Sequence, residues 1–257
     1  MRREIPNYQW ILTEDQSYTL FSEAFGESCH STTGARSETI LHYIKGCEVE
    51  TKLHRGPLTI LEVGFGLGVG FQTTLERLQG HQHEWTFISL ELDRELVNWF
   101  IQENSISGEW KKREGLDYFE AHLKNCLLIV LVGDARLSLP LFMKNNSLKW
   151  NAIYQDAFSP KRNPILWTVE WFEFLKNYAT DDVILSTYSA SSSIRKSLIE
   201  AGWKITKGDK FGPKRTSTRA RLLGESDQDI LIHLKNSPVP ALRDENIQLF
   251  LKGFKNE

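Results

Sequence analysis

The stretch LEVGFGLGVGF, residues 61–71, places four glycines within seven positions directly after an apolar run. A glycine-rich turn after a strand lets the backbone approach a ligand closely. The dinucleotide fingerprint G-x-G-x-x-G does not fit, because Val69 or Phe71 occupies the third glycine position in the two possible registers. The phosphate-binding pattern that closes with Lys and Ser or Thr is missing as well. The stretch therefore predicts a strand-to-helix ligand loop of another kind.

Alternating apolar and amphipathic segments surround this loop. The apolar runs predict buried strands at 58–63, 85–92, 127–134, 151–158 and 182–189. The amphipathic stretches predict helices at 70–80, 94–104, 114–125, 168–179 and 191–202. Strands that are apolar on both faces and alternate with helices indicate a doubly wound α/β fold with a mostly parallel sheet. Ligands of such folds bind at the carboxyl ends of the strands.

The ends of the chain carry less signal. Residues 9–22 contain two β-prone runs around Glu14, Asp15 and Gln16, which predict an N-terminal hairpin. We expect an extension over residues 1–50 and one catalytic domain over residues 51–257, and we make no prediction for the tail after Gly224.

Composition excludes several classes of protein. The net charge of −2 over 257 residues argues against non-specific coating of nucleic acid, although a local basic patch remains compatible with RNA binding. Three separated cysteines (Cys29, Cys47 and Cys126) form neither a zinc pattern nor a disulfide framework. The apolar runs are too short to span a bilayer. We expect a cytoplasmic protein with no membrane segment and no metal.

The acid-x-Gly-x-Gly-x-Gly run formed by Glu62, Gly64, Gly66 and Gly68 resembles the first motif of class I methyltransferases that use S-adenosyl-L-methionine (SAM). This resemblance implies that Glu62 faces the ammonium of SAM and that the glycines, with Phe65 between them, line its methionyl and ribose portions. Glu91 ends the second predicted strand and is suited to accept hydrogen bonds from ribose hydroxyls. Asp134 ends the third, where it can accept from an adenine amino group beside an apolar neighbour such as Leu137.

The end of the fourth predicted strand carries the residues that we expect to take part in the reaction. The run DAFSPKRNPILW, residues 156–167, resembles the Asp/Asn-Pro-Pro-aromatic loop of methyltransferases that act on amino groups. Asp156 can accept an N–H bond from a neutral amine and aim its lone pair, and Phe158 can stack on a planar substrate. Asp156 then serves both the catalytic and the SAM-binding side.

The same run is similar to a signature of the MnmC-type tRNA methyltransferases, and the glycine loop, FISLE (87–91), YSASSSIRKSLIEAGW (188–203) and KFGPKR (210–215) extend the resemblance along the chain. The resemblance implies SAM-dependent N-methylation of 5-aminomethyluridine, usually with a 2-thio group, at the wobble position (uridine 34) of a tRNA anticodon stem-loop. The length leaves no room for the flavin oxidoreductase fused to this domain in many bacteria. We therefore expect a stand-alone form, with another enzyme supplying the aminomethyl group.

A basic segment suggests where tRNA binds. Residues 204–221 contain seven Lys or Arg and one acid, which suits phosphate contacts and equally suits a solvated face. The expected substrate contacts are Arg162, Tyr188, Lys210, Lys214 and Arg215. Two alternatives remain open at this point: an aminopropyltransferase of the spermidine synthase type, and a non-catalytic tRNA-binding module.

Overall fold

The computed structural model describes residues 3–211 and 216–253, and within them a nine-stranded sheet forms the centre. Its strands lie in the order β11 (Lys204–Lys207), β12 (Thr218–Arg221), β10 (Ala179–Thr187), β9 (Trp150–Gln155), β4 (Leu58–Val63), β5 (Trp85–Glu91), β8 (Cys126–Val132), β7 (Leu116–Leu123) and β6 (Glu109–Arg113). The five inner strands, β10 to β8, are parallel, and two antiparallel strands follow on each side. The predicted α/β fold and its five core strands are confirmed.

The order of the parallel strands reverses at β4. From β4 the chain proceeds outward to β5 and β8, then returns to β9 on the other side of β4 and continues to β10. Open α/β sheets bind ligands outside the carboxyl ends of the strands at such a reversal. The loops after β4 and β9 therefore lie where the fold favours a ligand.

Helices cover both faces of the sheet. They are α1 (Ala35–Glu38), the π-helix η1 (Thr39–Lys45), α2 (Val49–Arg55), α3 (Val69–Arg77), α4 (Arg94–Glu103), α5 (Ala135–Met143), the 3₁₀ turn η2 (Pro164–Trp167), α6 (Val169–Asn177), α7 (Ser192–Glu200), α8 (Gln228–Asn236), the 3₁₀ turn η3 (Asp244–Asn246) and α9 (Ile247–Gly253). Alternate residues of β4 enter two cores: Ile60 packs with η1, α2, α3 and α4, and Leu61 packs with α5, α6 and α7. This alternation explains why the parallel strands are apolar on both faces.

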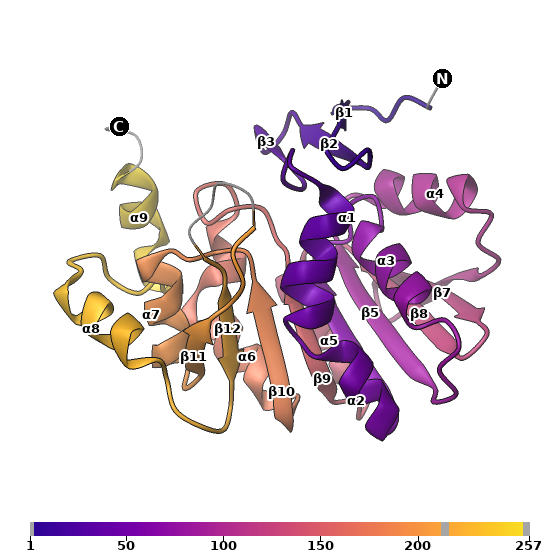
Figure 1. The fold of residues 1–257 in the computed structure, drawn as a ribbon. Helices are drawn as coiled ribbons and strands as arrows, with labels where there is room; N and C mark the ends of the chain where they lie inside the picture. The colour runs from indigo at the N-terminus through magenta and orange to yellow at the C-terminus, as the bar shows by residue number, and fades with distance from the viewer. Residues whose placement is uncertain (1–2, 212–215, 254–257) are drawn as a thin grey trace.

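The N-terminal hairpin is present and gains a third strand. The strands β1 (Tyr8–Leu12), β2 (Tyr18–Ser22) and β3 (Glu27–Ser28) form a separate antiparallel sheet. Figure 1 shows this small sheet above one end of the central strands, with α1 and α2 running across the front of the central sheet. The extension is thus placed over an end of the sheet.

The predicted helix at 114–125 is wrong, because this segment forms β7. Arg113 pairs with Leu116, so Glu114 and Gly115 form a two-residue hairpin turn between β6 and β7. Both turn residues have positive φ, 51° and 86°, as a type I′ turn requires. The next two-residue loop carries Leu123 back to Cys126, at the start of β8. Strand pairing on both sides of β7 overrides its local helical pattern.

Across the described residues, 3–211 and 216–253, no helix has the length and apolar character that a membrane span requires.

Candidate active site

A cavity of about 300 Å³ lies at the carboxyl ends of β4, β5, β8 and β9. Gly64 and Gly66, Glu91, Asp134 and Asp156 line it from these strand ends. Its other wall comes from the N-terminal extension. The volume falls in the range typical of small-molecule sites. The cavity thus brings together acids from three strand ends that the sequence predicted to form one site.

The glycine loop divides between the cavity and the core. Gly64 has φ of 104°, and a Cβ there would lie 2.8 Å from the Asp156 carbonyl oxygen. A side chain at Gly66 would enter the cavity, since the nearest atoms, 4.0 Å from its Cβ position, belong to the cavity-lining Cys29 and His30. A Cβ at Gly68 would instead meet the Phe100 ring at 2.5 Å. Gly68 is therefore required for packing.

Two other residues predicted to bind SAM lie away from the cavity. Phe65 is buried in the core, with its ring edge-on to Phe100 at 4.9 Å. Glu62 is also buried and accepts a 2.6 Å hydrogen bond from the Ser89 hydroxyl. Burial holds the pKa of Glu62 well above its usual value. Neither side chain lines the cavity, so the structure does not bring them together with Gly64, Gly66, Glu91 and Asp134.

Glu91 is held at the cavity wall by backbone donors. Its two carboxylate oxygens accept from the N–H of Gly66, at 2.8 Å, and of Asp93, at 2.9 Å. Burial raises the pKa of Glu91 to about 7, against the opposing effect of these hydrogen bonds. The group therefore titrates near neutral pH and joins the glycine loop to the end of β5.

Asp134 lines the cavity at the end of β8 and also caps α5. Its carboxylate accepts from the Arg136 N–H at 2.9 Å. Leu137, expected to pack on an adenine ring, is 71% exposed and does not line the cavity. Ala135, Ile165 and Leu166 provide apolar lining instead.

Asp156 follows β9 and is held by the N-terminal extension. The Tyr43 hydroxyl donates to Asp156 Oδ1 at 2.6 Å, and His30 Nε2 lies 3.9 Å from Oδ2. The Asp156 side chain is only 10% exposed. Phe158, two residues on, stacks on Phe25 with ring centroids 4.3 Å apart. An acceptor carboxylate and an aromatic pair thus share this end of the cavity.

The extension supplies residues that the sequence analysis did not predict. Tyr8, Phe25, Cys29 and His30 line the cavity. They precede the glycine loop by at least 34 positions, so local motifs do not link them to it. Only the run ESCH at 27–30, directly after the predicted hairpin, could have indicated a functional site in this extension, because its four neighbouring side chains are all polar or reactive.

Three of the predicted substrate residues, Tyr188, Arg162 and Lys210, lie outside the cavity. Tyr188 donates to the Ala157 carbonyl at 2.9 Å and so supports the loop after β9. Arg162 is exposed beside Gly26, and Lys210 is exposed on the basic segment. Lys214 and Arg215 lie outside the described residues. Ion pairs occupy Lys207, Arg219 and Arg221, which pair with Asp229, Asp209 and Glu48 respectively. The basic segment is therefore partly neutralised.

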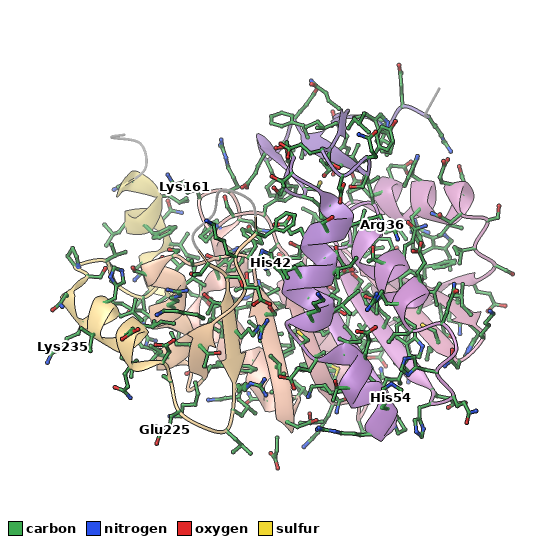
Figure 2. The ribbon with its side chains drawn as sticks, in the orientation of Figure 1. Arg36, His42, His54, Lys161, Glu225 and Lys235 are labelled. Atoms are coloured by element: carbon green, nitrogen blue, oxygen red, sulfur yellow. The ribbon has the colours of Figure 1, made fainter. Side chains whose placement is uncertain are left out.

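A second hollow, of about 450 Å³, is lined by His54, His81 and their neighbours. Figure 2 shows His54 at the opposite end of the sheet from Lys161, which belongs to the loop after β9. In the described ranges, 3–211 and 216–253, no group of three or more His, Cys, Asp or Glu side chains is arranged to hold a metal ion.

Comparison with known proteins defines the class. Residues 102–222 match a family described as S-adenosyl-L-methionine-dependent methyltransferase. Together with the sheet order and the strand-end cavity, this match defines the chain as a SAM-dependent methyltransferase. The residues present fit that cofactor, since Gly66 leaves room at the cavity wall for a ligand and Glu91 presents a carboxylate there.

Within this class, the chain is similar to MnmC proteins, which confirms the resemblance inferred from the sequence. It is 29% identical over 249 residues to the tRNA 5-methylaminomethyl-2-thiouridine biosynthesis bifunctional protein MnmC of Paraburkholderia phymatum, covering 90% of this chain and 37% of that protein. Identity to the protein of the same name in Burkholderia multivorans is 30% over 226 residues, covering 80% and 33%. The chain therefore spans only 33–37% of the length of these two relatives. The crystal structure of MNMC2 from Aquifex aeolicus superposes with a TM-score of 0.77 at 27% identity, covering 96% of this chain and 82% of that one.

Proposed function

We propose that this protein methylates the amino group of 5-aminomethyluridine, with or without a 2-thio group, at the wobble position of tRNA. The product is the 5-methylaminomethyl nucleoside after which its MnmC relatives are named. The observation that carries the proposal is the Asp156 carboxylate at the cavity wall, held by Tyr43 and next to the aromatic Phe158.

The transfer is a single displacement. Bound SAM supplies a methyl group on a sulfonium: the amine lone pair forms the N–C bond, the S–C electron pair returns to sulfur, and the resulting secondary ammonium loses one proton to solvent. Asp156 accepts an N–H of the neutral amine and directs the lone pair. Correct positioning of reactants supplies much of the acceleration in reactions of this kind.

We further propose which residues hold SAM. Glu91 accepts from the ribose hydroxyls, and Asp134 accepts from the adenine amino group. The backbone at Gly64 and Gly66 borders the part of the ligand between these acids and Asp156. The positions of all five residues around one cavity support this assignment.

Exposed residues near the Asp156 end of the cavity suggest where tRNA binds. We propose that the uracil ring displaces Phe25 and stacks on Phe158, because rings 4.3 Å apart leave no room for a third ring between them. Arg162 and Lys210 are exposed and suited to phosphate contacts, which makes binding dependent on salt. Another enzyme supplies the aminomethyl group.

Nucleoside analysis by mass spectrometry tests the proposed function. tRNA bearing 5-aminomethyl-2-thiouridine is incubated with the protein and SAM, and we expect that nucleoside to gain one methyl group. An unchanged nucleoside, with SAM bound normally, would contradict the assigned acceptor. A parallel reaction with polyamines in place of tRNA tests whether the protein instead acts on small diffusible amines, as the aminopropyltransferase alternative implies.

A further inference from the structure

The His30 imidazole has no role in the function described so far, although it lines the cavity beside Asp156. It follows β3 in the N-terminal extension, and its side chain is only 7% exposed. Its Cε1 atom lies 4.0 Å from the Cβ position built on Gly66, and its Nε2 lies 3.9 Å from Asp156 Oδ2. His30 therefore sits between the glycine loop and the carboxylate that we propose receives the amine.

Thr19 fixes the orientation of this ring. The Thr19 hydroxyl oxygen accepts the backbone N–H of His30 at 3.1 Å and lies 3.1 Å from His30 Nδ1. A hydroxyl oxygen has two lone pairs, so it can accept from the backbone N–H and from Nδ1–H together. With the proton on Nδ1, Nε2 carries none and can accept a hydrogen bond on the side facing Asp156, and this is the tautomer that the inference below requires.

The charge state of His30 agrees with this arrangement. Burial lowers the pKa of His30 to about 4, which leaves the imidazole neutral at physiological pH. A protonated ring would be a donor at both nitrogens, whereas the neutral ring keeps one acceptor.

The separation between His30 and Asp156 suits a bridging amine. A distance of 3.9 Å between Nε2 and Oδ2 is too long for a direct hydrogen bond. For a nitrogen placed about 2.9 Å from both atoms, the Nε2···N···Oδ2 angle would be about 85°. The two N–H bonds of a primary amine can point at both acceptors with only small deviations from linear hydrogen bonds.

We propose that His30 Nε2 is the second acceptor for the substrate amine and that this contact limits the enzyme to one methyl transfer. The inference rests on the proposed function, because it assumes a primary amine as acceptor. Asp156 Oδ2 accepts one N–H and His30 Nε2 accepts the other, which leaves the lone pair for the methyl group. After one transfer the neutral product amine keeps a single N–H. Presenting its lone pair again would leave either His30 or Asp156 without a donor, or press the new methyl group against one of them.

The second transfer is measured directly. tRNA that already bears 5-methylaminomethyl-2-thiouridine is incubated with SAM and either the wild-type protein or His30→Ala. We expect no dimethylated nucleoside from the wild type and a readily measured amount from His30→Ala. On the aminomethyl substrate, the first transfer by His30→Ala should be slower by about 10-fold or more, since one hydrogen bond to the amine is lost.

His30→Gln is the matched control. Its side-chain carbonyl oxygen can accept an N–H near the position of Nε2, so this variant should again stop after one methyl group. If His30→Ala binds SAM normally and forms no dimethylated product, His30 does not limit the number of transfers and the proposal is overturned. If the wild type leaves the aminomethyl nucleoside unchanged, the proposed function itself fails. That outcome differs from the failure of the His30 inference, in which the wild type is active and His30→Ala forms no dimethylated product.

A tautomer measurement needs neither substrate nor variant. In wild-type protein with 15N-labelled histidine, the nitrogen shifts of His30 distinguish a protonated from an unprotonated Nε2. We expect Nδ1–H with an unprotonated Nε2. A proton on Nε2 would make it a donor toward Asp156 and would overturn the proposal even if the variants failed to fold.

Discussion

The Tyr43 hydroxyl donates a 2.6 Å hydrogen bond to Asp156 Oδ1, joining positions 113 residues apart in the sequence. Tyr43 belongs to the π-helix η1, and its ring stacks on Tyr154 of β9 at 5.2 Å. Single π-type turns occur often at functional sites. The contact shows that the N-terminal extension completes the candidate site from outside the methyltransferase sheet.

Replacing Tyr43 by Phe should lower the rate of methyl transfer by about 10-fold or more, because hydrogen bonds to charged groups contribute about 1.5–3 kcal/mol. The affinity for SAM should change little, since Tyr43 acts by orienting Asp156. Steady-state kinetics and calorimetric titration separate the two effects. Tyr154→Phe is the matched control, because its buried hydroxyl interacts with the Thr74 hydroxyl at 3.2 Å. Equal rates in the two variants would exclude an orienting role.

The affinity for SAM should depend on pH through Glu91. Its pKa in the free protein is about 7, so the carboxylate is mainly protonated below that pH. Ribose hydroxyls donate more strongly to the ionised form, so SAM affinity should rise by about tenfold from pH 6 to pH 8 and level off above. Glu91→Gln should bind more weakly and lose this part of the pH dependence. Calorimetric titrations measure the SAM affinity of both proteins against pH. The same pH dependence in Glu91→Gln as in the wild type would show that Glu91 is not its cause.

Gly64→Ala should both destabilise the fold and reduce transfer. The residue has φ of 104°, and the added Cβ would press on the Asp156 carbonyl oxygen. Gly80→Ala is the control, because its φ of 89° imposes similar strain while its Cβ meets no atom within 4 Å. We expect Gly64→Ala to be less stable than Gly80→Ala by about 1–3 kcal/mol in urea unfolding, and only Gly64→Ala to lose activity. Equal stability of the two variants would show that the loop tolerates this contact.

The sequence predicts the parallel core well, because buried strands that are apolar on both faces carry a strong local pattern. It also predicts that Glu91, Asp134 and Asp156 meet, since parallel strands bring their carboxyl ends to one edge. Residues 114–125 were predicted as a helix because Leu116, Phe119 and Leu123 recur at helical spacing, whereas the Glu114–Gly115 turn sets a hairpin. Helix α5 is not among the predicted helices, because its interior contains Pro140, a residue that disfavours helices.

The remaining site residues depend on contacts between distant segments. Tyr43 and His30 reach Asp156 only because the extension folds over the sheet end. Phe65 shares the glycine motif with its cavity-lining neighbours, but its side chain points into the core against Phe100. A motif fixes the path of the backbone more reliably than the direction of each side chain within it.

The central claim is that Asp156 directs the acceptor amine, and Asp156→Asn tests it most directly. SAM affinity by calorimetry and single-turnover methyl transfer to aminomethyl-bearing tRNA are measured on the same preparation. We predict SAM affinity close to that of the wild type and a rate of transfer lower by about 100-fold, as expected for a misplaced nucleophile. Loss of SAM affinity in proportion to the loss of transfer would instead place Asp156 in the cofactor site alone and contradict this account.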